Sequence, residues 1–320
     1  MKIYPLSDDL VYISLVLSDY SFKIPASILL KSAMAQFNLV HCISENPCFH
    51  GLNGYKEVIE SLDWGLKELG HNSHYSVNTI ASDAINILFG AQVLSLEALQ
   101  ALPENSIIYN SEQMRGLEKY QVRVQTQFIA TKFMIWDYSN ANLDPWKMLG
   151  ATNVKIVPIA YAPILTRILK PAEQDIDVLL YGISGGKRLE AFQILSQAGL
   201  KVMFFSGLYG DARDQLIARS KIILNVNLYN FAQIFEIVRV SYLLANRKAV
   251  VSVIDKNTFF EEDLSKSIHL TSMDNLLNDC LLLLQNTSAR ESLENSGFGF
   301  FSKKLITGYL SNLLTSILLH

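Results

Sequence analysis

The sequence of 320 residues predicts an α/β protein with two similar halves, each built on a parallel sheet. Short apolar runs rich in β-branched residues alternate with helical patterns along most of the chain, which is typical of parallel strands joined by helices. A stretch punctuated by Pro158, Pro163 and Pro171 interrupts this alternation near the middle. The length and the 50% hydrophobic content suit about two domains. We therefore expect domains at 1–160 and 161–320.

In the first half, an amphipathic helix is expected at 54–69, because Gly70 follows it at the position where a left-handed residue ends many helices. The apolar run at 10–17 is too short to span a bilayer, and the acidic start of the chain lacks the pattern of a signal peptide. These features favour a cytoplasmic protein without stable membrane insertion. Strands are expected at 37–43, 73–77, 85–89, 106–109, 133–136 and 154–157.

The second half repeats the scheme. The tail from Asp274 onward is helical by its leucine pattern, with a last segment at 305–319. The expected strands are 178–181, 202–205, 221–224 and 249–253, and the expected helices are 187–198, 211–219 and 233–244.

Composition narrows the functional class. A formal net charge of −3 gives no sign of a nucleic-acid partner. The three cysteines are an odd number without metal-ligand spacing, so reduced thiols are favoured over disulfides or a zinc site. No group of His, Asp or Glu has the spacing of a metal site either, so the sequence predicts no metal and no bound cofactor.

A glycine-rich loop follows the first strand of the second half. Glycines allow backbone N–H groups to approach an anion, and the helix that follows directs its positive end toward it. A basic side chain at the start of that helix can neutralise a diphosphate. The alternative is an ordinary strand-to-helix turn. The candidate anion-binding residues are Gly182, Ser184, Gly185, Gly186, Lys187 and Arg188.

A polar end follows the β-branched run that begins at Lys221, and an apolar helix comes next. Glu236 and Arg239 lie three residues apart on this helix and therefore share a face. Amides and a carboxylate suit the hydroxyls of a sugar, and a carboxylate in the first helical turn is favoured by the helix dipole. The alternative is an internal ion pair that fixes the helix. The polar residues at the strand end are Asn225, Asn227, Tyr229 and Asn230.

Three residues of the first half are candidates for catalysis. His50 lies after the first strand of the sheet, where it could act as a general base. Glu112 and Asp137 follow later strands and are alternative bases. A lone histidine is more often structural, and each acid could instead cap the helix that follows it.

The segment 221–252 resembles the donor-binding segment of GT-B glycosyltransferases, especially the group 1 superfamily and its CgeB-like relatives. The shared feature is a helix with an acidic residue that leads into a small-residue turn and an apolar strand, here 244–252. The chain departs from the family pattern in that turn, which lacks the usual Gly and Pro. Tyr242 and Ile234 align with the two glutamates of the family's signature. The two-glutamate signature is therefore absent from this chain. Glu236 is the acidic residue of the helix, and it is assigned as the acid that contacts the donor.

The resemblance implies two Rossmann-like domains that face each other across a cleft, with the last helix crossing back to the first domain. It also implies a hexosyltransferase-like enzyme of glycan biosynthesis. Such an enzyme takes a nucleotide-sugar on the second domain and a glycan, protein or other acceptor on the first, without a metal. Rival hypotheses are a sugar-nucleotide epimerase-like enzyme and a catalytically silent nucleotide- or glycan-binding protein on the same fold. A periplasmic-type binding protein is disfavoured because no export signal is present.

Overall fold

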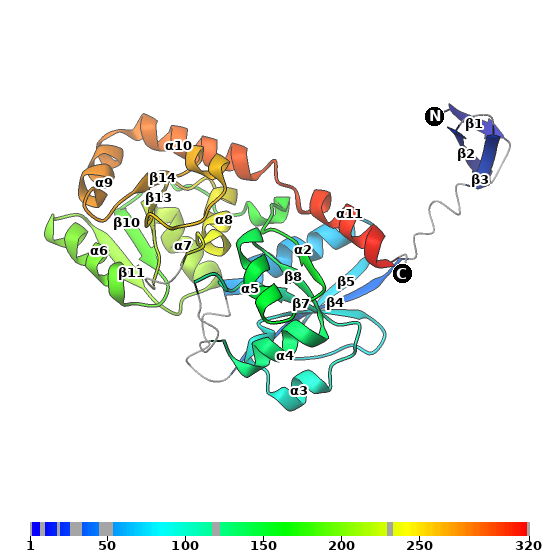
Figure 1. The fold of residues 1–320 in the computed structure, drawn as a ribbon. Helices are drawn as coiled ribbons and strands as arrows, with labels where there is room; N and C mark the ends of the chain where they lie inside the picture. Colours follow the sequence, from blue (N-terminus) through cyan, green and yellow to red (C-terminus); the bar gives the residue numbers. More distant parts are fainter. Residues whose placement is uncertain are drawn as a thin grey trace.

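The computed structural model describes residues 34–44, 54–116, 122–228 and 233–318, together with the backbone of three short strands between residues 2 and 25. Within these ranges, two parallel sheets account for most of the strands, as Figure 1 shows. The α/β class predicted from the alternating pattern is confirmed.

The first sheet has six strands in the order β5-β4-β6-β7-β8-β9, and every neighbouring pair is parallel. Each strand overlaps one of the predicted runs. The strands are β4 (Gln36–His41), β5 (Asn72–Val77), β6 (Ile85–Phe89), β7 (Ile107–Asn110), β8 (Met134–Asp137) and β9 (Val154–Ile156). The helices of this half are α2 (Lys56–Glu68), α3 (Leu96–Gln100), α4 (Val124–Lys132) and α5 (Leu143–Met148).

The second sheet has five parallel strands in the order β11-β10-β12-β13-β14. Four of them were predicted, whereas β14 (His269–Thr271) is only three residues long and gives no periodic signal. The other strands are β10 (Ile176–Tyr181), β11 (Val202–Phe205), β12 (Ser220–Val226) and β13 (Val250–Val253). The helices are α6 (Gly186–Gln197), α7 (Gly210–Arg219), α8 (Ile237–Ala245), α9 (Leu276–Gln285), α10 (Thr287–Phe301) and α11 (Ile306–Leu318).

Each sheet has a switch point at its first strand. The chain pairs β10 with β11 on one side and with β12 on the other, and it treats β4 in the same way with β5 and β6. In open parallel sheets the loops at the carboxyl end of such a strand separate, and ligands bind there. In the second sheet this position follows Tyr181, at the predicted glycine-rich loop.

Helix α11 crosses back from the second half and packs against α2, as predicted (Figure 1). The backbone guides the crossing, because Tyr161 N donates to Lys304 O at 2.8 Å and Ile306 N donates to Tyr161 O at 3.0 Å. Gly65 of α2 allows the close approach. A Cβ atom at this position would lie 2.7 Å from Cγ2 of Ile306.

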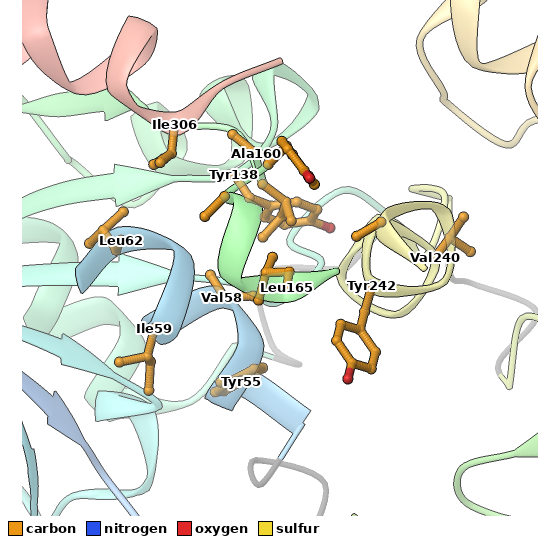
Figure 2. Close-up of a cluster of buried hydrophobic side chains, with 14 of the residues drawn as sticks. Tyr55, Val58, Ile59, Leu62, Tyr138, Ala160, Leu165, Val240, Tyr242 and Ile306 are labelled. Carbon is orange, nitrogen blue, oxygen red and sulfur yellow. The ribbon is translucent and has the colours of Figure 1, made fainter. Parts of the chain in front are cut away.

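One hydrophobic cluster continues through both halves. It includes Val58 and Leu62 of α2, Leu165 of the short helix Pro163–Leu165, Leu244 of α8 and Ile306 of α11. Figure 2 shows Leu165 between α2 and α8 in this cluster. The predicted division into domains at residue 160 falls between β9 and β10 and stays a prediction.

The stretch before residue 26 forms a separate antiparallel sheet of β1 (Lys2–Leu6), β2 (Leu10–Leu17) and β3 (Tyr20–Pro25). The sequence indicated only an apolar run at 10–17, which is now seen to be the central strand. Among the residues that the structure describes, none of the helices has the length and apolar character needed to cross a membrane.

The start of α8 differs from the prediction. The helix was expected from Gln233 but begins at Ile237. Residues 233–235 are extended instead, because Phe259 N donates to Gln233 O at 2.7 Å and Phe235 N donates to Phe259 O at 2.9 Å. Glu236 therefore occupies the N-cap position of α8, just outside the first helical turn.

Candidate functional site

The glycine-rich loop lies at the switch point of the second sheet. Gly182, Gly185 and Gly186 all have positive φ angles, +121°, +144° and +47°, which side chains disfavour. Helix α6 begins at Gly186, so its amino-terminal end lies in this loop. The glycines thus shape a turn before the helix, as both the anion-binding hypothesis and the ordinary-turn hypothesis require, and anion binding stays a prediction.

Gly182 is also required for space. A Cβ atom there would lie 2.9 Å from Arg188 Nη1 and 2.9 Å from Arg239 Nη2. Two guanidinium groups thus converge beside the same backbone position. Arg188 comes from the first turn of α6 and Arg239 from the first turn of α8.

Glu236 holds these two arginines together. Arg188 Nη2 donates to both carboxylate oxygens of Glu236, at 2.7 and 3.0 Å. Arg239 Nη2 lies 2.9 Å from Glu236 Oε2. The i, i+3 pair that the sequence indicated is formed, and Arg188 joins it from 48 residues away. The ion-pair hypothesis for Glu236 thus describes contacts that are present, and the ligand hypothesis requires the same carboxylate to bind a donor as well.

Arg239 is the more accessible of the two arginines. The exposed fraction of its side chain is 17%, against 5% for Arg188. Its guanidinium lies 5.3 Å from the ring centroid of Tyr181 and 3.5 Å from Asn225 Oδ1. Arg239 therefore faces the end of β10 while it remains paired with Glu236.

The charges at this edge do not cancel. Lys187 is neutralised by Asp255, with Nζ 2.6 Å from Oδ1, whereas Glu236 carries one negative charge between two guanidinium groups. These five described side chains together carry an excess of one positive charge beside the amino-terminal end of α6. A helix end with backbone N–H groups and a local positive charge is suited to bind an anion.

The structure brings together only part of the predicted donor set. Gly182, Arg188, Glu236 and Arg239 are in contact, and Asn227 is buried in the loop after β12. Ser184 is exposed, and Lys187 is directed to Asp255. Tyr229 lies outside the described residues.

The candidates of the first half are in contrasting environments. His50 lies outside the described residues. Glu112 is exposed and accepts a hydrogen bond from the hydroxyl of Tyr55. Asp137 is completely buried. Of the two described acids, only Glu112 is accessible to a ligand.

Asp137 is the centre of a polar network. Its carboxylate accepts hydrogen bonds from Trp146 Nε1 at 2.6 Å, Asn110 Nδ2 at 2.7 Å, Ser139 N at 2.8 Å and Asn142 Nδ2 at 3.0 Å. Burial raises the pKa of Asp137, and these donors act in the opposite direction. The expected helix cap is Ser139 instead, whose hydroxyl accepts from Ala141 N at the start of the short helix Asn140–Asn142, while Asp137 accepts from Ser139 N within the preceding turn.

Glu112 belongs to a loop that meets the segment before Glu236. Ile234 N donates to Gln113 Oε1 at 2.9 Å, and Arg115 Nε donates to Gln233 Oε1 at 3.4 Å. Burial, followed by the negative charges of Asp137, Glu112 and Glu236, raises the pKa of Tyr138. Candidate residues from the two halves thus approach one another.

A charged cluster that the sequence did not reveal joins α2 to α7. Arg213 Nη2 donates to Glu57 Oε1 at 2.6 Å, and both side chains are buried. Tyr242 donates to Asp214 Oδ2 at 2.6 Å and accepts from Arg167 Nε at 2.9 Å. Tyr242, the residue aligned with a family glutamate, thus holds Arg167 and Asp214 within the second half, and Arg167 Nη1 donates to Glu60 Oε2 of α2 at 2.8 Å. No periodic pattern marks these pairs, because their partners are far apart in sequence.

Asp255 was also missed as a neighbour of the site, whereas Tyr181 ends the strand that the sequence predicted before the glycine loop. Tyr181 directly precedes Gly182, and its ring stacks on Phe205 with centroids 5.5 Å apart. Asp255 follows β13, at the same edge of the sheet as the glycine loop. A polar residue soon after a predicted strand is the signal that could have identified Asp255.

The described residues contain no cluster of three or more potential metal ligands among His, Cys, Asp and Glu. A hollow of about 610 Å³ lies between β14, α9 and the start of α10, where it includes His269 and Asp279. None of the residues around Glu236 contributes to it. We place the candidate site at the switch point because charge, glycines and topology coincide there.

The fold is that of the GT-B glycosyltransferases. The chain is similar to AviGT4, a glycosyltransferase involved in avilamycin A biosynthesis, with a TM-score of 0.57 and 13% identity over 89% of this chain and 98% of that one. It is also similar to Anabaena HepE in complex with UDP-glucose, with a TM-score of 0.56 and 11% identity over 88% and 99% of the two chains. WaaG, a glycosyltransferase of lipopolysaccharide biosynthesis, gives a TM-score of 0.52 and 9% identity over 88% and 99%.

Sequence comparison gives less. No family model matches the chain. A curated relative, the uncharacterized protein R358 of Acanthamoeba polyphaga mimivirus, is 25% identical over 194 residues, which are 59% of this chain and 65% of the relative. The chain thus aligns with less than two thirds of that protein's length.

Proposed function

We propose that the protein is a glycosyltransferase that transfers a sugar from a nucleotide-sugar donor to a glycan, protein or other acceptor. The observation that carries this proposal is the pair of guanidinium groups beside Gly182, at the switch point of the second sheet. The excess positive charge there suits a diphosphate, which is the leaving group of a nucleotide-sugar. The structure of HepE with UDP-glucose supports the choice of donor class.

The donor binds to the second half in this proposal. Backbone N–H groups of the loop at Gly185 and Gly186 and the Arg239 guanidinium face the diphosphate, and Asn227 and Tyr229 contribute to the donor pocket. Oε2 of Glu236 contacts both Arg188 and Arg239, whereas Oε1 contacts Arg188 and can accept a second hydrogen bond. A hydroxyl of the sugar or ribose is the expected donor of that bond.

The acceptor binds to the first half. Glu112 is the described acid best placed to act as a base, because its loop contacts the segment that precedes Glu236. His50 remains a candidate from the sequence, while the buried network assigns Asp137 a supporting role. We infer a cytoplasmic role in glycan biosynthesis and no requirement for a metal.

The proposal is tested with purified protein and a set of UDP-, GDP-, CMP- and TDP-sugars. A ligand that binds only the folded protein raises Tm, so one donor class should raise it. R239Q should weaken binding of that donor about tenfold to a hundredfold, since a charge-assisted hydrogen bond contributes about 1.5–3 kcal/mol. Donor turnover, measured as the release of the nucleoside diphosphate, should persist in the presence of EDTA.

The outcomes separate the alternatives. Turnover of the donor without an acceptor would indicate an epimerase-like enzyme or hydrolysis. Binding without turnover on any acceptor would indicate a silent binding protein. No Tm shift with any nucleotide-sugar, or loss of turnover in EDTA that Mg²⁺ or Mn²⁺ restores, would contradict the proposal.

A further inference from the structure

Arg188 differs from Arg239 in what its guanidinium contacts. Arg188 Nε donates to Val226 O at 2.7 Å, Nη1 donates to Ile183 O at 3.1 Å, and Nη2 donates to Glu236. With only 4% of the residue exposed, its N–H groups are directed to protein acceptors. A ligand at the edge of the sheet would find little of this side chain accessible.

These contacts connect three separate segments. Ile183 lies in the glycine loop, Val226 ends β12, and Glu236 precedes α8. The planar guanidinium supplies donors in fixed directions, so one side chain sets the spacing among all three segments. A lysine ammonium is a point charge and cannot make the same set of contacts.

The location of Arg239 depends on this arrangement. Glu236 accepts from Arg188 and pairs with Arg239, while Gly182 leaves the space that both guanidinium groups use. Displacement of Arg188 would release Glu236 and the loop together, and Arg239 would lose its partner. The effect of Arg188 on a ligand is therefore transmitted through Glu236 and Arg239.

We propose that Arg188 is a positioning residue, which fixes the glycine loop and the Glu236–Arg239 pair, and that Arg239 is the arginine that contacts the diphosphate of the donor. This inference rests on the proposed function. It assigns different tasks to two arginines that charge alone would make equivalent.

A double-mutant cycle tests the assignment. Binding of UDP is measured by isothermal titration calorimetry for the wild type, R188K, R239Q and R188K/R239Q. R239Q should weaken UDP binding about tenfold to a hundredfold. R188K should weaken it to a similar degree, because a misplaced contact loses most of its value. In the R239Q background, R188K should change the affinity by less than about threefold, since residues that act through one contact are not additive.

R219K is the matched control. Arg219 is an exposed arginine that pairs with Asp175 near the amino end of the second sheet, and its replacement should leave UDP binding unchanged. If the losses of R188K and R239Q multiply in the double variant, Arg188 contacts the ligand directly and the assignment is wrong. If wild-type protein binds neither UDP, GDP nor TDP, the proposed function fails, and the assignment fails with it.

R188K could also unfold the protein, because Arg188 is buried. A crystal structure of the wild type with UDP then decides. The assignment requires a hydrogen bond from Arg239 to a phosphate oxygen and none from Arg188. A hydrogen bond from Arg188 to either phosphate would overturn it.

Discussion

Of the two arginine contacts of Glu236, one could be predicted from the sequence and the other could not. The spacing of Glu236 and Arg239 predicted a shared face, and the ion pair is present at 2.9 Å. The third member, Arg188, could not be paired with them from the sequence, because contacts between strand ends depend on the order of strands in the sheet. The sequence marked Arg188 as basic and near a glycine loop, but its burial was not predictable.

Asp137 provides a test at the same scale. All its described hydrogen-bond partners are donors, so D137N would place an amide NH₂ group against at least one of them. We expect a loss of about 1–3 kcal/mol in the free energy of unfolding, measured by urea denaturation. Turnover per folded molecule should change little. Full stability combined with lost turnover would instead make Asp137 the catalytic base.

Asp137 also makes the free energy of unfolding depend on pH in a defined direction. Burial raises the pKa of Asp137 in the folded protein, so its folded carboxyl binds a proton more tightly than its unfolded one. The stability linked to this proton is present below the ordinary pKa of an aspartate and is lost as the pH rises through the raised value. The free energy of unfolding of D137N, measured by urea denaturation across this pH range, should lack the part of the decrease that the Asp137 proton causes in the wild type.

At the scale of elements, strands were easier to predict than helix ends. Parallel strands are commonly buried on both faces and therefore appear as largely apolar runs. One of them, Ile85–Phe89, is apolar except for Asn86, and the sequence located it without error. The start of α8 was missed by four residues, because Gln233 and Phe235 form backbone hydrogen bonds with Phe259. Such a contact leaves no trace in local propensity.

Packing of α11 on α2 is tested at Gly65. G65V introduces a branched side chain whose Cβ would lie only 2.7 Å from Cγ2 of Ile306, so α11 must shift. We expect a loss of about 1–3 kcal/mol in the free energy of unfolding. G308A is the control, because nothing lies within 4 Å of its added Cβ. An alanine within a helix should stabilise the protein by about 0.5–1 kcal/mol. Equal effects of the two variants would contradict the packing.

For the whole molecule, the two halves are joined by more than the connecting chain. The hydrophobic cluster passes through α2, Leu165, α8 and α11, and the Glu57–Arg213 pair links α2 to α7. The sequence predicted the crossing helix by family resemblance, but it gave no indication of the buried charges. Long-range ion pairs cannot be inferred from composition or periodicity.

Glu57 provides the test at this scale. E57Q leaves the Arg213 guanidinium, with an exposed side-chain fraction of 6%, without its close carboxylate on α2. Loss of one member of a buried pair typically costs about 3–5 kcal/mol in the free energy of unfolding, and E57Q should fall at the lower end of this range because Arg213 Nη2 still donates to Asp214 Oδ1 at 2.8 Å. K67A, which breaks an ion pair with 54% of the lysine side chain exposed, should cost about 1 kcal/mol or less. Similar midpoints in urea for E57Q and K67A would show that Glu57 does not stabilise the joint.

The crossing of α11 also has a consequence for the order of events during synthesis. Residues 36–156 emerge from the ribosome well before residues 306–318, which cover α2 with Ile306, Leu310 and Leu314. The apolar face of α2 therefore stays without its final cover while the second half is being translated. Domains usually fold as they emerge from the ribosome. Here the first half emerges early but is completed only when α11 has been synthesised. A chaperone that binds exposed apolar helices would have its longest opportunity at α2.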